Sequence, residues 1–414
     1  MTSREKIEVL IGRGVKIPRP ETVEIGQEVV ADRISGEGVV ISPGCRILGA
    51  STLIMRGTRI GTEGPVVVED CLLGPEVILG SGTFRGAVFL KGATAGPGSQ
   101  IREGCLLEEE AGCAHTVGLK QTILFPFVTL GSLINFCDCL MAGGTSRKNH
   151  SEVGSSYIHF NYTPNQDKAT PSLIGDVPRG VMMNQPPIFL GGQGGMVGPI
   201  RMGFGVVTVA GAILRRDCPE DCWLIAEEKN ASTAVPRVPG LYRGISRKVF
   251  NNVVFIANLA ALRQWYLRVR VLFVGPDFSE ELWKGATRVL ETSREERIKR
   301  LKELAAKMPE SIRLLRATSG EDFSRLAAEQ EEFHRSWSRL EASLRERCGA
   351  GGDPALFDAF IKKAEEGIEN GGRDYVRVIQ GLRPEDSSRG TEWLRGIVDG
   401  VVGAAVQAVP AFKP

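Results

Sequence analysis

Small and apolar residues recur at intervals of six along residues 190–217, LGGQGGMVGPIRMGFGVVTVAGAILRRD. One phase of this repeat contains Val197, Gly203, Val209 and Arg215. A period of six differs from the 3.6 residues of a helix and from the two residues of a strand. A fixed short period indicates one structural unit that is stacked many times. We therefore predict a left-handed parallel β-helix, in which three six-residue units form one triangular coil of about 18 residues.

The same pattern of aliphatic and small residues extends back to about residue 20, for example in VISPG at 40–44 and IREG at 101–104. Of the 50 glycines, 34 lie in residues 1–220, where tight corners of a solenoid require them, and 16 lie in residues 221–414. This difference separates a solenoid half from a different C-terminal half. We predict five regions: an N-terminal cap (1–19), the β-helix (20–217), a connector (218–245), long helices with heptad segments (246–346) and short C-terminal helices (347–414).

Two segments interrupt the repeat, AGGTSRKNH at 142–150 and PRGVMMNQPP at 178–187. Loops that leave a regular solenoid cost little stability and often shape the binding face. We therefore expect these two interruptions to lie near a functional surface.

The C-terminal half has a helical period. Apolar residues recur at spacings of three and four, with one glutamine among them, at Phe323, Leu326, Gln330, Phe333, Trp337, Leu340 and Leu344. Three such heptads indicate either an antiparallel helical hairpin within one chain or a coiled coil between subunits. We expect Pro309 to kink or break the preceding helical stretch.

Composition narrows the class of protein. With 51 basic and 49 acidic residues, the chain gives no electrostatic reason to expect nucleic acid as a partner. The N-terminus lacks the apolar region of a signal peptide, and no run of about 18 apolar residues predicts a membrane span. We expect a cytoplasmic protein whose nine scattered cysteines are reduced. The pair Cys218 and Cys222 lacks further ligands nearby, so no metal is predicted.

Two stretches closely resemble a known family. Residues 151–162, SEVGSSYIHFNY, align without gaps to the coil of glucosamine-1-phosphate acetyltransferase domains that ends in an Asn-Tyr-Asp-Gly motif. Residues 190–217 align with the later acetyl-CoA-binding coils of those domains. Upstream, KQTI at 120–123 resembles the coil with the sugar-phosphate lysine, and SLINFCD at 132–138 resembles a His-Leu-x-Tyr-x-Gly-Asp stretch. The resemblance covers residues 118–217 and implies a homotrimer with sites between subunits.

This family is the acetyltransferase half of the bifunctional N-acetylglucosamine-1-phosphate uridyltransferase/glucosamine-1-phosphate acetyltransferase. We find no Gly-rich nucleotide loop near the N-terminus and expect the pyrophosphorylase domain to be absent. The resemblance implies acetyl-CoA as co-substrate, without a metal. It also implies substrate-binding roles for Lys120, Asn135, Asn161, Tyr162 and Lys168. For the cofactor it implies backbone contacts at Gly192, Gln193 and Ala210.

The family's catalytic base is a histidine, and in this alignment Ser132 takes its position. A serine hydroxyl alone is far too weak a base near neutral pH. His150, beside Arg147 and Lys148 in the first interruption, is one candidate for the base. The other is His159, whose alternation with two apolar neighbours predicts a side chain that projects outward. His115 and His334 read as structural residues.

These observations favour a hexapeptide-repeat transferase that acts on a sugar phosphate or nucleotide sugar, with acetyl-CoA as the acyl donor. One alternative is a relative of UDP-N-acetylglucosamine pyrophosphorylases that lacks the nucleotidyltransferase domain. Another is a non-catalytic trimeric scaffold that binds a sugar nucleotide. Replacement of the family histidine by Ser132 favours the last alternative, whereas Lys120 and the Asn161-Tyr162 pair favour a ligand site.

Overall fold

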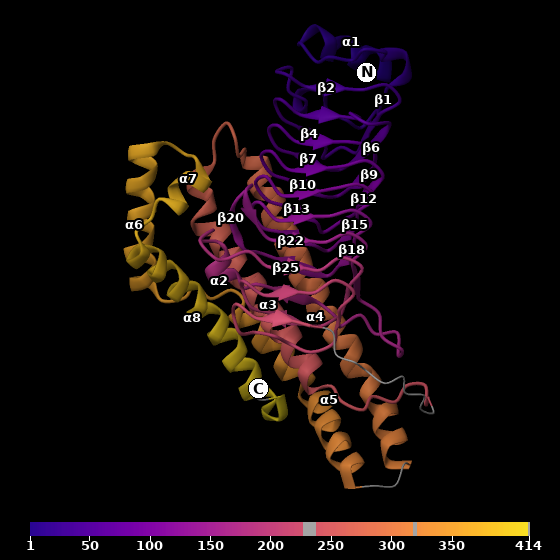
Figure 1. The fold of residues 1–414 in the computed structure, drawn as a ribbon, viewed down its shortest axis with the longest axis vertical. Coiled ribbons are helices and arrows are strands. Elements are labelled where there is room, and N and C mark those ends of the chain that lie inside the picture. The colour runs from indigo at the N-terminus through magenta and orange to yellow at the C-terminus, as the bar shows by residue number, and fades with distance from the viewer. Residues whose placement is uncertain (227–236, 318–320, 413–414) are drawn as a thin grey trace.

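The computed structural model describes residues 1–226, 237–317 and 321–412. A β-helix forms the first half of the chain, and long helices lie along one of its sides (Figure 1). The solenoid strands begin at Glu24 and end at Ile225. The predicted β-helix followed by a helical region is therefore confirmed, and the last coil extends eight residues beyond the predicted boundary at 217.

Three parallel sheets form the faces of the solenoid, and the chain visits them in the order I, II, III in each coil. Sheet I contains β1 (Glu24–Ile25), β3 (Arg46–Leu48), β6 (Val66–Glu69), β9 (Gly82–Arg85), β12 (Ser99–Ile101), β15 (Gly118–Lys120), β18 (Asn135–Cys137), β23 (Ile158–Phe160), β26 (Gly195–Val197) and β29 (Ile213–Leu214). Sheet II contains β4 (Leu53–Ile54), β7 (Leu72–Leu73), β10 (Val88–Phe89), β13 (Leu106–Leu107), β16 (Ile123–Leu124), β19 (Cys139–Met141), β24 (Ser172–Ile174) and β27 (Arg201–Met202). Sheet III contains β2 (Val40–Ile41), β5 (Arg59–Ile60), β8 (Ile78–Leu79), β11 (Thr94–Ala95), β14 (Gly112–Cys113), β17 (Thr129–Leu130), β22 (Glu152–Val153), β25 (Phe189–Leu190), β28 (Val207–Thr208) and β30 (Leu224–Ile225).

Excursions leave this regular winding at three places. The first predicted interruption forms a hairpin of β20 (Gly144–Ser146) and β21 (Asn149–His150), and the second contains the short helix α2 (Val177–Gly180). A third excursion, at 161–171, joins β23 to β24 and was not expected from the sequence.

Helices flank and follow the solenoid. The N-terminal α1 (Ser3–Gly12) and the 3-10 turns η1 (Pro20–Thr22) and η2 (Ala31–Arg33) lie at its first coils. The C-terminal half contains α3 (Ser246–Arg268), η3 (Arg270–Phe273), α4 (Glu280–Ala317), α5 (Glu321–Arg347), α6 (Pro354–Gly371), α7 (Tyr375–Gln380), α8 (Pro384–Ala408) and η4 (Pro410–Phe412). Helix α4 continues past Pro309, so of the two expected effects of this proline the break does not occur.

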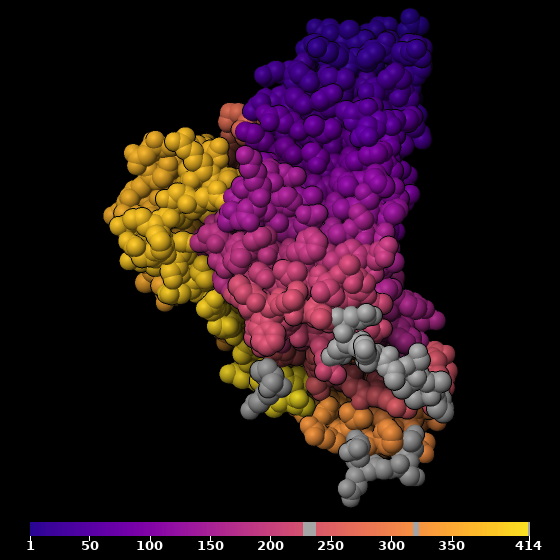
Figure 2. Space-filling model, in the orientation of Figure 1, coloured from indigo at the N-terminus to yellow at the C-terminus, as the bar shows by residue number. Residues whose placement is uncertain are grey.

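The helical region covers sheet II, because α4 packs on β7 and β10 and α3 packs on β24. The fit is close at Gly285 of α4, where an added Cβ would lie 2.1 Å from Leu72 Cδ1. The outward residues of sheet II are apolar and buried in most coils, as at Leu72, Val88 and Leu106. The first coils of the solenoid stand clear of the helices (Figure 2).

Helices α4 and α5 pair with each other in antiparallel fashion within the chain. Ion pairs join Arg345 to Glu295 and Arg316 to Glu331 at opposite ends of the pair. Gln330, the polar residue among the heptads, is buried and donates from Nε2 to the carbonyl of Tyr242 at 2.7 Å. The heptad segment is therefore a hairpin within one chain, the first of the two predicted arrangements.

Candidate functional site

A column of equivalent residues runs along the corner where sheet III passes into sheet I. The register of β15 on β18, with Gly118 opposite Asn135, stacks His115 directly on Ser132. The Leu133 amide accordingly donates to the carbonyl of His115 at 3.0 Å. The same position in the following coils is taken by small residues, Ser155, Gly192 and Ala210.

This corner column connects the family histidine position with the predicted cofactor residues. The three positions predicted to contact acetyl-CoA, Gly192, Gln193 and Ala210, all lie on this corner, and Gln193 adopts a φ of 53° at the turn itself. His115 is exposed at the other end of the column, one coil before Ser132. From the sequence alone, His115 is expected to be structural. The 17-residue spacing between His115 and Ser132, one coil apart, was the signal that could have identified it.

A hollow of about 460 Å³ lies on the face of sheet I beside this corner. Gly118 forms its floor, because an added Cβ there would meet no atom closer than 3.9 Å. Thr116 lies at the hollow's corner edge, and its hydroxyl is 3.5 Å from Nδ1 of the neighbouring His115. Asn135, the predicted substrate residue, lines the hollow and is exposed. Its amide oxygen accepts from the thiol of Cys137 at 3.6 Å, so the amide nitrogen is the group able to donate to a ligand.

Basic side chains lie along the opposite edge of the hollow. Arg102 lines it, and Lys120 is stacked beside Arg102 in the next coil. Lys120 Nζ pairs with Glu103 Oε1 at 2.6 Å, and both side chains are partly exposed. The lysine lowers the pKa of Glu103 through their hydrogen bond, which outweighs partial burial. The edge therefore offers cations that an anionic group can approach from solvent.

His159 does not project outward, which corrects the sequence-based expectation. Its side chain is 2% exposed and points into the solenoid, where Nε2 lies 2.8 Å from Ser172 Oγ. Burial lowers the pKa of His159 to about 4. Its neighbours Ile158 and Phe160 are the residues that project from sheet I. The alternation was read in the wrong phase because this part of sheet I has an apolar outer surface.

His150 lies at a different corner, where sheet II passes into sheet III. Its Nδ1 lies 2.8 Å from the carbonyl of Arg147, and its Nε2 lies 3.8 Å from Glu152 Oε2. Arg147 ties the hairpin to the solenoid, because its Nη1 donates to Thr129 Oγ1 at 2.7 Å and to the carbonyl of Phe127 at 3.1 Å. The structure does not bring His150 together with Lys120, which lies where sheet I passes into sheet II.

Asn161, Tyr162 and Lys168 belong to the third excursion, on the same side of sheet I as Lys120. Tyr162 is 58% exposed, two coils away from Lys120. Asn161 Nδ2 is 3.4 Å from Asp138 Oδ2, and Asp138 Oδ1 pairs with the buried Arg297 of α4 at 2.8 Å. Arg297 Nη1 also donates to the carbonyl of Lys168 at 3.4 Å. Helix α4 thus covers part of this corner.

Apolar side chains are exposed on the later coils, outside the area covered by helices. Ile158 and Ile213 project from sheet I, and Phe189, Val207 and Leu224 form a stack on sheet III, each at least 38% exposed. The corner column lies between these two apolar surfaces. No helix in the described residues is long and apolar enough to span a membrane. No group of three or more His, Cys, Asp or Glu side chains there is arranged to hold a metal.

Comparisons with known proteins find sequence similarity over about half of the chain. No family model matches the chain. Bifunctional protein GlmU of Nitratidesulfovibrio vulgaris is 28% identical over 232 residues, 55% of this chain and 44% of that protein. Bifunctional protein GlmU of Thermus thermophilus is 29% identical over 222 residues, 53% of this chain and 43% of that protein. The matched region spans less than half the length of these relatives.

Among solved structures, a UDP-N-acetylglucosamine acyltransferase from Campylobacter jejuni is 13% identical. The match covers 76% of this chain and 93% of that one, with a TM-score of 0.18. By its own fold and its sequence matches, the chain is a hexapeptide-repeat β-helix similar over about half its length to bifunctional GlmU proteins, joined here to a C-terminal helical region.

Proposed function

We propose that this protein is an acyltransferase that moves the acetyl group of acetyl-CoA to an amine of a sugar phosphate or nucleotide sugar. The observation that carries the proposal is the corner column, in which an exposed histidine is followed by four coils of small residues. His115, Ser132, Ser155, Gly192 and Ala210 span four inter-strand spacings, about 19 Å at about 4.8 Å each. This length and lack of bulk suit an extended thioester arm whose reactive end lies at His115.

Acetyl transfer to an amine requires a general base and a hydrogen-bond donor to the oxyanion. The acceptor nitrogen attacks the thioester carbonyl, the C–S bond breaks, and the CoA thiolate leaves and takes up a proton. His115 accepts the proton that the nitrogen loses. The Asn135 amide, which lines the hollow on sheet I, donates to the carbonyl oxygen as its negative charge develops.

The acceptor lies across the hollow, with its phosphate at the basic edge. Arg102 and Lys120 supply the cations there, and Lys120 exchanges its partner Glu103 for the ligand phosphate. Tyr162, exposed at the same side of sheet I, supplies a hydroxyl to the sugar. Lys168 is exposed in the same excursion and remains a proposed contact of the acceptor.

A second copy of the chain completes the site. One chain provides only one wall of the hollow, and the apolar surfaces on sheets I and III flank the corner column. Contiguous exposed apolar surface marks a protein interface more often than free surface. We propose a homotrimer in which these surfaces of neighbouring copies meet and enclose the column.

Ligand-induced stabilisation tests the proposal. Acetyl-CoA at 100 times its Kd stabilises a one-site protein by about 2.7 kcal/mol, which raises the melting temperature of the full chain. Ala210→Glu places a carboxylate in the column and should abolish this shift. Ala50→Glu makes the same change at an exposed position on another corner and should leave the shift intact. If both variants keep the shift in melting temperature, the proposed placement of acetyl-CoA in the column is wrong.

A non-catalytic sugar-nucleotide-binding trimer is the second candidate. Ser132 in place of the family histidine favours it. In that case UDP-N-acetylglucosamine stabilises the protein, acetyl-CoA does not, and His115→Ala leaves the shift by the sugar nucleotide unchanged. Stabilisation by acetyl-CoA that depends on Ala210 excludes this candidate.

A further inference from the structure

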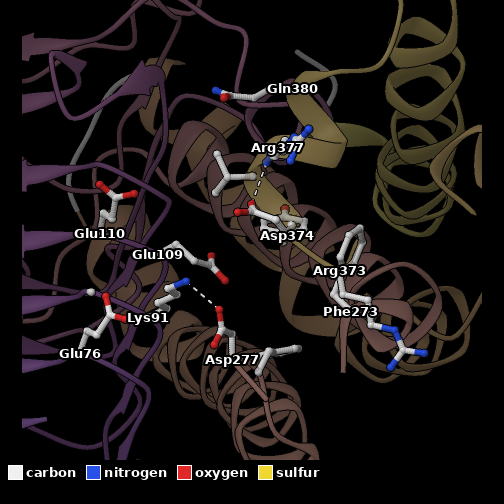
Figure 3. A pocket seen from close by; sticks show the side chains of 14 residues that line it. Glu76, Lys91, Glu109, Glu110, Phe273, Asp277, Arg373, Asp374, Arg377 and Gln380 are labelled. Atoms are coloured by element: carbon white, nitrogen blue, oxygen red, sulfur yellow. Dashed lines mark hydrogen bonds and ion pairs between the residues drawn. The ribbon is translucent and has the colours of Figure 1, made fainter. Parts of the chain in front are cut away.

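A second hollow lies far from the corner column, between the solenoid and the helical region. It has a volume of about 450 Å³, within the range of small-molecule sites. One wall comes from corners where sheet II passes into sheet III, with Glu76, Lys91 and Glu109. The other wall comes from residues 273–278 and from residues 373–380 around α7 (Figure 3).

Glu109 is the buried polar group in this cavity. The residue is 9% exposed, and its Oε1 accepts from Arg270 Nη2 at 2.5 Å. Its Oε2 is buried and has no hydrogen-bond partner among the described residues. In Figure 3 the Glu109 carboxylate points into the space between the two walls. A buried carboxylate oxygen without a donor is costly, so a donor from a ligand would be favourable.

Lys91 and Arg373, two of the basic side chains that line the cavity, are already paired, whereas Nε and Nη1 of the buried Arg270 have no partner among the described residues. Lys91 Nζ pairs with Asp277 Oδ2 at 2.6 Å, and Arg373 Nη1 donates to the carbonyl of Val274 at 2.6 Å. Arg270 is fully buried, and its guanidinium lies 3.7 Å from the ring centre of Tyr375. None of these three groups is placed to supply the missing donor to Glu109 Oε2.

Carboxylates outnumber basic side chains in the lining of the cavity, and Arg270 and Arg56 pair with some of them from outside the lining. Five carboxylates and three basic side chains line the cavity, and the carboxylates are Glu76, Glu109, Glu110, Asp277 and Asp374. Directly behind Glu109, the buried Glu108 accepts a hydrogen bond from the Tyr266 hydroxyl. Aromatic surface is also present, from Phe273, Phe278 and Tyr375. A cation with a carbon frame finds both carboxylates and apolar contact here.

We propose that this cavity binds a small organic cation, an amine or guanidine, that donates a hydrogen bond to Glu109 Oε2 and lies between Asp374 and the aromatic rings. The site is separate from the proposed transferase site, which lies on sheet I. Because its two walls belong to the solenoid and to the helical region, the bound cation also joins these two parts of the chain.

Calorimetric titration of the full chain with 1,5-diaminopentane tests this proposal. We expect saturable binding, whereas the neutral analogue 1,5-pentanediol should not bind. Glu109→Gln keeps the shape of the side chain, removes its charge and should weaken diamine binding about tenfold or more. The matched control is Glu63→Gln, an exposed residue on another part of the solenoid, and it should bind the diamine normally.

A second variant guards against damage to the fold, because Glu109 also pairs with the buried Arg270. Asp374→Asn retains a side chain that can cap α7 and removes one charge from the far wall. It too should weaken the diamine. Absence of diamine binding to the wild-type chain, equal binding of the diol, or competition of Mg²⁺ with the diamine at equal concentration would each overturn the assignment of an organic cation.

Discussion

At the scale of single residues, the most unusual group is the carboxylate pair in the second hollow. Glu108 is 2% exposed, and burial raises its pKa to about 7, with the neighbouring Glu109 adding to the effect and Arg270 opposing it. Tyr266 donates to its carboxylate, which satisfies one oxygen. The folded chain therefore holds a proton on Glu108 at a pH where an unfolded glutamate has lost it.

Glu108 should make the stability of the protein depend on pH. Because its pKa is raised in the folded state, its contribution is fully present below about pH 4.5 and is lost as the pH rises through about 7. A shift of this size corresponds to about 3 kcal/mol at most. Glu108→Gln stays uncharged, so it should gain stability relative to the wild type between pH 5 and pH 8. Urea unfolding at several pH values measures this difference, and parallel pH profiles of the two proteins would contradict it.

The histidines show what residue-level reasoning can and cannot predict. Periodicity correctly placed His159 in a strand of the solenoid, but its direction depended on which face of sheet I is apolar. His115 was overlooked because its role depends on the neighbouring coil rather than on its own sequence context. Only the observed register, which stacks His115 on Ser132, places it next to the family histidine position.

At the scale of elements, close packing between helices depends on glycine. An added Cβ on Gly390 of α8 would lie 2.6 Å from the ring of Phe360 in α6 and 2.6 Å from Met182 Cε. The Phe360 ring is itself fixed between Trp265 and Trp393. Gly396 of the same helix has no atom within 4 Å of such a Cβ.

These two glycines should respond oppositely to alanine. Gly390→Ala should destabilise the protein by about 1–3 kcal/mol, because the Phe360 ring beside it is held by Trp265 and Trp393. Gly396→Ala should stabilise it by up to about 1 kcal/mol through helix propensity. Denaturant unfolding of both variants measures the two effects. If Gly390→Ala is as stable as Gly396→Ala, α8 does not pack on α6 as described.

At the scale of the whole molecule, the helical region acts as the cover of sheet II. The sequence predicted both halves, but not their docking. The signal was present: the sheet II strands from β4 to β24 each have two adjacent apolar residues, such as Leu72-Leu73 and Leu106-Leu107, where a solvent-exposed sheet needs only one. Interpreting it required the coil register, since only the register shows that one residue of each pair faces outward.

Removal of the helices should therefore make the solenoid insoluble. A fragment of residues 1–226 exposes the outward apolar column of sheet II, including Leu72, Val88 and Leu106. We expect it to aggregate, and polar replacements of these three outward residues should reduce the aggregation. Light scattering of the 1–226 fragment with and without the three polar replacements measures the difference in aggregation. A well-behaved, monodisperse 1–226 fragment would mean that the helices are not needed to cover this face.

The proposed site required the most structural information. Lys120, Asn135 and the cofactor positions followed from the resemblance, and the structure places Asn135 in the hollow and the cofactor positions on the adjoining corner. The excursion at 161–171 packs against α4 through Asn161, Asp138 and Arg297, a contact between distant segments that no local pattern indicates.

The most direct test of this account is release of free thiol from acetyl-CoA with glucosamine 1-phosphate as acceptor. We expect turnover by the full chain and wild-type turnover in His150→Ala. In His115→Ala, turnover should be at least about a hundredfold lower, the usual scale for loss of a general base. His115 and His150 lie at different corners of the solenoid, so the pair of variants separates the two positions. Normal turnover in His115→Ala, or its loss in His150→Ala, would contradict the assignment of the reaction to the corner column.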